Sequence, residues 1–152
     1  MFGGHAGQVH CASPARLAAE LAAIDHPHIR AILDVSHSYL RNGFHGSDFV
    51  AEIAALAPFA NHLHVHDSFG RADAIWMYHK SERLAFGHGD QHLPVGWGSI
   101  PWDALMEACV FPVGAVFDIE LNPRYWHAVE ACIAATRALA ARARTQGAGA
   151  AA

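Results

Sequence analysis

The sequence predicts an α/β protein with about three parallel strands and four helices. Three observations lead to this class. Short apolar runs near residues 30–36, 61–67 and 114–120 have the length of buried strands, and segments with helical spacing precede and separate them. Histidine and carboxylate residues stand at or near the ends of all three runs. Alternation with helices favours parallel strands, whose carboxyl ends share one edge of the sheet.

The first helix is expected over residues 14–25. Ser13 is a favourable N-cap, because its hydroxyl can accept a hydrogen bond from a backbone N–H of the first turn. Pro14 suits the first helical position, where its missing N–H costs nothing. The helix would bury one apolar face, which consists of Leu17, Leu21 and Ile24.

A buried strand over residues 30–36 comes next and is expected to pass into a glycine-containing loop at 42–46. Ser47 can cap the helix that follows, with Asp48 in its first turn, where a negative charge suits the helix dipole. Pro58 ends this helix. Its core face is formed by Phe49, Val50, Ile53 and Leu56.

The second strand is expected over residues 61–67, and a long connection over 68–99 separates it from the next helix. Connections of this length in compact domains are usually functional or disordered. Residues 74–80 are predicted to form a short helical turn inside it. The third helix is expected to begin near Pro101 and to include Trp102, Leu105 and Met106.

The chain is expected to close with a third strand over residues 114–120 and a final helix over about 124–142. We interpret residues 1–142 as one domain. The remainder, 143–152, is rich in Ala and Gly and is expected to be a disordered tail.

Composition describes a globular chain with a large apolar interior, since 53% of its 152 residues are hydrophobic and 16% are charged. The net charge of −4 gives no electrostatic reason to expect a nucleic-acid partner, which usually requires a basic surplus. No apolar stretch approaches the roughly 20 residues that a membrane helix needs, so no membrane span is expected.

The cysteines indicate neither a disulfide framework nor a zinc knuckle. Cys11, Cys109 and Cys132 are widely spaced, and buried thiols in a reducing compartment are the expected form. Residues 1–5 lack the basic start and apolar core of a secretory signal. A cytoplasmic location is therefore expected.

The clustered histidines and carboxylates predict a divalent metal site. Nitrogen and oxygen ligands that come from several separate strands are what such a site needs. The chain has 13 histidines, so their positions matter more than their number. The clusters stand at residues 34–37, 62–67 and 118–120 and in a loop at 90–92.

Four motifs, in order along the chain, link these clusters to a known pattern. Residues 33–37 (LDVSH) match Leu-Asp-x-x-His, and residues 62–67 (HLHVHD) match His-x-His-x-Lys-Asp except that His66 replaces the Lys. Residues 92–102 (HLPVGWGSIPW) match His-x-Pro-x-Gly-x-Gly-x-Ile-x-Trp. The last strand ends in Ile-Glu, as residues 119–120 do.

With these motifs the chain resembles the xylose isomerase-like TIM barrels. This superfamily contains sugar and sugar-phosphate isomerases and epimerases and also endonuclease IV. The resemblance spans about residues 13–135. One departure is Trp97, which stands where members often carry a polar residue. Together the motifs are specific, although each alone is weak.

The resemblance implies that the chain is the C-terminal half of an eight-stranded barrel of about 250 residues, the region of the sixth to eighth strands. The first metal-binding Glu of the family lies upstream of this region and has no counterpart here. Either the chain is a fragment that starts at an internal Met1, which is the simpler idea, or it is a half-barrel that pairs with a partner. Open sheet edges and an exposed apolar face would favour association.

The resemblance also implies roles for individual residues. Asp34, His64 and Glu120 correspond to ligands of the metal that the superfamily shares. His37 corresponds either to a ligand of a second metal or to a neutral imidazole that contacts the substrate. Asp90 and His92 resemble the pair that supports a third metal in endonuclease IV, although isomerase-like members often have a similar His there.

Residues beside these candidates have more open interpretations. His62 and His66 share the face of His64 at period two, so one of them is expected to line the interior or to orient a ligand. Asp67 and Asp118 are expected to support ligands or the fold. Surface or loop positions are expected for His5, His10, His26, His28, His45, His79, His88 and His127.

Two tryptophans and two basic residues complete the candidates. Trp102 is expected to pack in the core. Trp97, in the glycine-rich loop, is a candidate for stacking on a sugar. Arg71 and Lys80 lie in the long connection and are expected to be solvated rather than to contact an anionic substrate.

The leading functional hypothesis is a metal-dependent isomerase or epimerase that acts on a sugar or sugar phosphate. A divalent ion (Mn²⁺, Mg²⁺, Co²⁺ or Zn²⁺) would bind substrate oxygens and stabilise the enediolate, while carboxylates on opposite sides move the proton. Glu120 would be one carboxylate and the upstream Glu the other, so little or no activity is expected from this chain alone. His37 is the second candidate catalytic residue.

Two alternatives remain open. Zinc-dependent phosphoester hydrolysis of the endonuclease IV type fits Asp90 and His92, but the acidic charge balance counts against it. A non-catalytic barrel fragment that binds a partner is the other alternative. Metal stoichiometry separates the three: one ion indicates the isomerase, three zinc ions the phosphoesterase, and none the fragment.

Overall fold

A parallel sheet of three strands organises the computed structural model, which describes residues 13–71 and 79–145. The strands are β1 (Ala31–Asp34), β2 (Ala60–Val65) and β4 (Val116–Ile119), and they lie in the order β1-β2-β4. Both neighbouring pairs are parallel. The predicted α/β class with three parallel strands is therefore confirmed, with each strand beside the next in chain order, as in a barrel wall.

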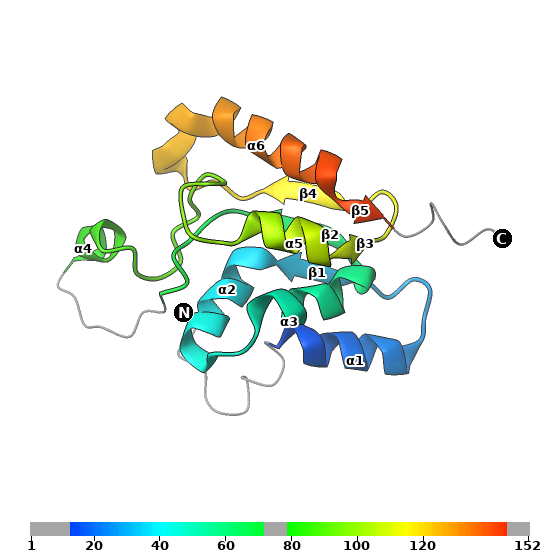
Figure 1. The fold of residues 1–152 in the computed structure, drawn as a ribbon. Helices are drawn as coiled ribbons and strands as arrows, with labels where there is room; N and C mark the ends of the chain where they lie inside the picture. The colour runs from blue at the N-terminus through cyan, green and yellow to red at the C-terminus, as the bar shows by residue number, and fades with distance from the viewer. Residues whose placement is uncertain (1–12, 72–78, 146–152) are drawn as a thin grey trace.

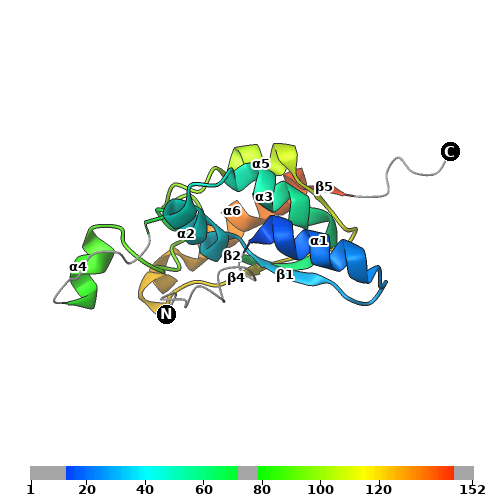
Figure 2. The same cartoon turned by 90° about the horizontal axis from the view of Figure 1, so that it is seen from below.

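The four expected helices are all present, and those that cover the sheet lie on one side of it. They are α1 (Pro14–Ile24), α3 (Phe49–Leu56), α5 (Trp102–Ala108) and α6 (Val129–Arg142), the last preceded by the 3₁₀ helix η2 (Pro123–Ala128). Figure 2 shows α1, α3 and α5 together on the same side of the strands. The predicted start of α1 is confirmed, because the Ser13 hydroxyl accepts a hydrogen bond from the Arg16 N–H.

Helix α2 (Val35–His45) corrects the prediction of a longer strand and a loop at 42–46. The strand stops at Asp34, because the carboxylate of this residue accepts a hydrogen bond from the His37 N–H and caps the helix. Gly46 ends the helix in the left-handed conformation, at φ +67°. The apolar run over residues 31–35 conceals this change from strand to helix.

Helix α4 (Lys80–Ala85) was not predicted from the sequence. It begins with a capping box in which the His79 N–H donates to the Glu82 carboxylate. The short helical turn expected at 74–80 lies mostly outside the described residues. Figure 1 shows α4 projecting at the end of the molecule toward which β1 runs.

A second, small sheet pairs β3 (Val110–Phe111) with β5 (Arg144–Thr145) in parallel. Strands of two residues have no periodicity from which to predict them. β5 lies at the start of the segment expected as an Ala/Gly tail, and residues 146–152 lie outside the described part of the chain.

Strict alternation gives the main sheet two different faces. Leu33 and Leu63 are each 1% exposed in the core beneath the helices. On the opposite face, Ile32 is 62% exposed and Val116 is 50% exposed. We call this second side the open face; its rows in register are Ile32, His62, Val116 and Asp34, His64, Asp118.

The cysteines and the lengths of the helices also bear on what the sequence predicted. Cys109 and Cys132 are buried free thiols, as expected, and Cys11 lies outside the described residues. No helix in the described part of the chain has both the length and the apolar character needed to cross a membrane.

Candidate metal centre

The carboxyl ends of the three parallel strands bring Asp34, His64 and Glu120 together. Asp34 ends β1 and is in register with His64 on β2, and Glu120 directly follows β4. His64 Nδ1 lies 3.6 Å from Asp34 Oδ2 and 3.3 Å from Glu120 Oε2. We call these residues the strand-end triad. One imidazole and two carboxylates therefore converge, although they are distant in sequence.

Asp34 also positions His37, one helical turn later. Asp34 Oδ1 accepts a hydrogen bond of 2.8 Å from the His37 N–H, and Asp34 Oδ2 lies 2.6 Å from His37 Nδ1. The other ring nitrogen, Nε2, lies 3.2 Å from Asp90 Oδ2. His37 thus stands between the strand end and the long loop.

The loop that contains Asp90 and His92 closes over the same site. His92 Nδ1 lies 2.9 Å from the Glu120 carbonyl oxygen, and because a carbonyl only accepts, Nδ1 carries the proton. Nε2 lies 3.1 Å from Asp90 Oδ2 and is the ring nitrogen left for a metal. The structure therefore brings together all six predicted ligands: Asp34, His37, His64, Asp90, His92 and Glu120.

The carboxylates and imidazoles strongly shift one another's pKa values. Burial lowers the pKa of His37, but Asp34 and Asp90 outweigh burial and raise it to about 10. Burial likewise raises the pKa of both Asp34 and Asp90, yet their histidine partners hold each well below its usual value. The hydrogen bond to Asp90 raises the pKa of His92. A metal that binds here must replace protons.

His66 is the central residue that sequence reasoning did not single out. It is 0% exposed, and neither ring nitrogen is hydrogen-bonded within the described part of the chain. Nε2 lies 3.4 Å from Asp34 Oδ1, and the ring stacks in parallel on His92 with centroids 3.8 Å apart. In the sequence, His66 lies two residues after His64 and so is expected on the same face of the strand. His62, two residues before His64, has the same relationship, so spacing alone could not distinguish them.

A buried carboxylate fixes the loop that carries His92. Asp67 is fully buried and accepts hydrogen bonds from Trp102 Nε1 and from three backbone N–H groups, those of Ser68, Gly96 and Ile100. Its backbone also pairs with that of Leu93 in both directions. His92 itself adopts φ +48°, an uncommon conformation for a residue with a side chain. Asp67 therefore supports the fold beside the site, and Trp102 is buried as expected.

The donor groups suit divalent metals. The strand-end triad offers one nitrogen and two carboxylates, a set that suits Mg²⁺, Mn²⁺, Co²⁺ or Zn²⁺. A second group, which we call the loop tetrad, consists of His37, His66, Asp90 and His92 and offers three imidazoles, as zinc prefers. Within each group the ligand atoms lie within 4.8 Å of one another. The buried Nδ1 of His66 adds to this fit, because it has no hydrogen-bond partner among the described residues and such a polar atom is costly to bury.

Residues around the site have more varied positions. Trp97 is 48% exposed beside the rings of Tyr125 and His127. Arg71 donates to the Phe86 carbonyl, and the Lys80 side chain lies outside the description. His5 and His10 also lie outside the described residues. Exposed positions, as expected, are found for His26, His28, His45, His79 and His127.

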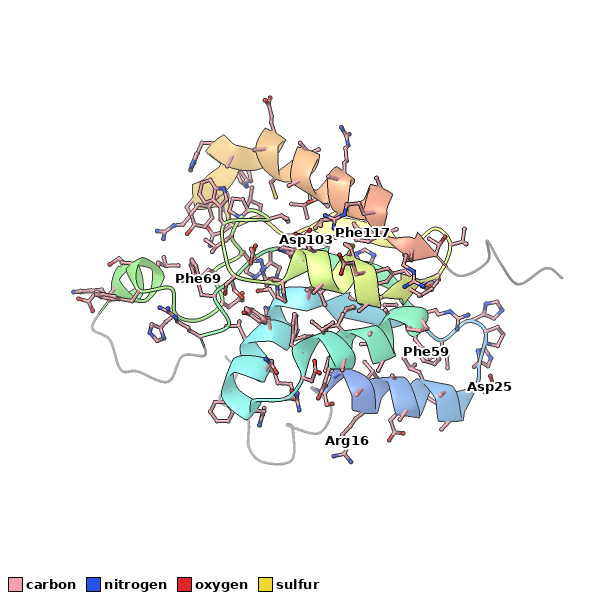
Figure 3. All side chains as sticks on the ribbon, viewed as in Figure 1. Arg16, Asp25, Phe59, Phe69, Asp103 and Phe117 are labelled. Carbon is pink, nitrogen blue, oxygen red and sulfur yellow. The ribbon has the colours of Figure 1, made fainter. Side chains whose placement is uncertain are left out.

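A shallow hollow elsewhere on the molecule is separate from these groups. Asp25 and Phe59 line this hollow, and Figure 3 shows them at one end of the molecule. Phe69, which follows the carboxyl end of β2, lies toward the other end. The hollow encloses about 280 Å³ and is lined by Leu21, Asp25, His26, Pro27, Arg30 and Phe59. It contains none of the predicted ligands.

Comparison with known proteins agrees with this architecture. A family model described as "Xylose isomerase-like TIM barrel" matches residues 3–112, which include every predicted ligand except Glu120. No curated protein and no solved structure matched the chain. The order of parallel strands and the site at their carboxyl ends fit part of such a barrel. The chain therefore belongs to the xylose isomerase-like TIM barrel family.

Proposed function

We propose that this chain carries the active site of a divalent-metal-dependent isomerase or epimerase that acts on a sugar or sugar phosphate. The observation that supports this most is the convergence of Asp34, His64 and Glu120 at the carboxyl ends of parallel strands, in a chain of this family. Active sites of TIM-barrel enzymes stand at these strand ends.

In this proposal the strand-end triad holds Mn²⁺, Mg²⁺, Co²⁺ or Zn²⁺. The ion would supply stabilisation of the negative charge that develops on two adjacent substrate oxygens. Asp34 and His64 serve as ligands. The backbone carbonyl of Glu120 accepts a hydrogen bond from His92 Nδ1, and the Glu120 carboxylate is partly exposed beside His64.

Glu120 is the proposed base, which takes a proton from the carbon next to the substrate carbonyl. His37 is held by Asp34 and Asp90 at the same site, where its imidazole would donate a hydrogen bond to a substrate hydroxyl or bind a second ion. An epimerase must return the proton to the opposite face of the carbon, and this step needs a second carboxylate. The family pattern carries that Glu upstream of this region, so we expect little or no turnover from these 152 residues alone.

Binding of sugar beside the metal can be tested without turnover. Bound Mn²⁺ accelerates the NMR relaxation of nearby protons, so the protons of an aldose, a ketose or their phosphates should relax faster when the Mn²⁺-loaded chain is present. Glu120→Gln should weaken this effect, whereas His45→Gln, an exposed histidine on α2, should not. The proposal is wrong if the chain binds Mn²⁺ and no sugar or sugar phosphate in the panel shows faster relaxation.

Zinc-dependent phosphoester hydrolysis is a second candidate, and the loop tetrad is the observation that favours it. Three imidazoles and a carboxylate next to the strand-end triad could hold further zinc ions. Three zinc ions per chain, together with cleavage of bis(p-nitrophenyl) phosphate by the zinc-loaded chain, would support this candidate. An ion at the strand-end triad, no ion at the loop tetrad and no such cleavage would support the isomerase.

We propose a reducing, cytoplasmic setting for this activity, supported by the buried free thiols of Cys109 and Cys132. A thiol-alkylation assay on the protein unfolded directly from cell extract tests this. Both thiols should react without prior reduction.

A further inference from the structure

Two histidines and an aspartate form a third group of donor atoms on the open face. His62 and His64 are two residues apart on β2, so both side chains point to this face. Asp118 on β4 is in register with His64. His62 Nε2 lies 3.2 Å from Asp118 Oδ2, and the two imidazole rings are nearly perpendicular, with centroids 5.4 Å apart. Their ligand atoms lie within 4.8 Å of one another.

This open-face group is distinct from the strand-end triad, although it shares His64 with that triad. The Nδ1 atom of His64 faces Asp34 and Glu120, at 3.6 and 3.3 Å. The other nitrogen of the His64 ring is Nε2. The two groups therefore share one imidazole and use different carboxylates; with an ion in each group, His64 would bind through both nitrogens as an imidazolate and release its ring proton.

Solvent can reach all three side chains. The side chain of His62 is 38% exposed, that of His64 is 27% exposed and that of Asp118 is 52% exposed. An exposed pair such as His62 and Asp118 contributes little to stability, so an ion that displaces this pair costs the protein little. The ligand atoms are therefore both accessible to an ion from solvent and close together before it binds.

We propose that His62, His64 and Asp118 form a second metal site, which takes a transition-metal ion such as Zn²⁺, Cu²⁺ or Ni²⁺. Two imidazoles and one carboxylate are ligands that these ions prefer, whereas Mg²⁺ prefers a set with more oxygen ligands, such as the two carboxylates of the strand-end triad. Three protein ligands leave a coordination position open to water or to another small ligand. This second site lies on the open face of the main sheet, next to the strand-end triad.

Zinc titration of the full chain in excess Mg²⁺ tests the proposal. Metal bound per chain is measured after dialysis for the wild type, His62→Gln, Asp118→Asn and the control His45→Gln. We expect His62→Gln and Asp118→Asn each to bind one zinc ion fewer than the wild type, with His45→Gln unchanged. Circular dichroism establishes that each variant is folded. Wild-type zinc content in both folded variants would overturn the proposal.

A spectroscopic measurement supplies a second readout. In ¹H–¹⁵N spectra of the histidine rings, zinc should shift the His62 resonance, which is assigned by its loss in His62→Gln. An unmoved His62 resonance at saturating zinc would also overturn the proposal. The proposal rests on a site separate from that of the proposed function, and the double variant Asp34→Asn/Glu120→Gln tests the two independently. It should lose metal binding at the strand-end triad but keep the zinc-induced shift of His62.

Discussion

Asp34 and His37 are joined at two points, one on the backbone and one on the side chain. Asp34 Oδ1 accepts a hydrogen bond of 2.8 Å from the His37 N–H, and Asp34 Oδ2 lies 2.6 Å from His37 Nδ1. The same carboxylate ends a strand, begins helix α2 and belongs to the strand-end triad. Local structure and the candidate site therefore depend on one side chain.

Two substitutions of Asp34 should separate these roles. Asn is as good an N-cap as Asp, so Asp34→Asn should keep helix α2 while it lowers divalent-metal affinity at least tenfold, because supporting residues alone are worth about 10- to 100-fold. Asp34→Ala should lose the metal equally and also destabilise the chain by about 1 kcal/mol through the lost cap. Calorimetric titration and urea unfolding measure the two effects. If Asp34→Asn binds metal as tightly as the wild type does, Asp34 is not a metal ligand.

The stability of the metal-free chain should depend on pH through His37. Its pKa rises from 6.5 to about 10 on folding, because Asp34 and Asp90 favour the protonated ring. The resulting stabilisation is complete below pH 6.5 and is lost as the pH rises toward about 10. In EDTA, the difference in unfolding free energy between wild type and His37→Gln should therefore shrink between pH 6 and about pH 10. A difference that stays constant over this range would contradict the assigned ion pairs.

Asp67 should matter more for stability than any exposed carboxylate. Asp67→Asn places an amide NH₂ where backbone N–H groups and the Trp102 indole now donate, so at least about 2 kcal/mol of stability should be lost. Asp103→Asn, which affects an exposed ion pair with Arg142, is the control and should cost less than about 1 kcal/mol. Urea unfolding monitored by circular dichroism measures both. Equal losses would show that the buried network is not what anchors the loop.

Gly43 should be sensitive to a small change despite its exposed position in a helix. Ala at an exposed helical position usually stabilises by about 1 kcal/mol relative to Gly. Here a Cβ at residue 43 would collide with the Gly70 backbone carbonyl, so Gly43→Ala should destabilise the chain instead. Phe44→Ala, at the next residue of α2, removes an exposed ring and should change stability by less than about 0.5 kcal/mol. Thermal unfolding gives the sign of each change, and stabilisation by Gly43→Ala would show that the two segments do not approach.

The open face should make the isolated chain associate. Ile32 and Val116 are exposed apolar side chains of the same row, and parallel sheets are normally covered on both faces. Light scattering after size exclusion should show a mass that increases with concentration. Ile32→Lys should reduce that increase, whereas Val113→Lys, at an exposed residue outside the main sheet, should not. A concentration-independent monomer would contradict association through this face.

Much of the architecture was readable from local patterns. Hydrophobic periodicity predicted the strands of the main sheet and four of the helices, and the capping signal at Ser13 and Pro14 placed the start of α1 correctly at Pro14. Periodicity could not predict α2, because its capping residue also ends an apolar strand. Nor could it predict β3 and β5, which pair only because residues far apart in the chain meet.

The sequence by itself determined the fold class, through the alternation of strands and helices, and its motifs carry the family resemblance that implied the six candidate ligands. Only the tertiary structure decided which donors share a group. The parallel register places His64 between Asp34 and Asp118, so one imidazole borders two groups. Loop closure buries His66 against His92, whereas His62 remains exposed beside Asp118. These neighbours depend on backbone pairing between distant segments, which no local pattern encodes.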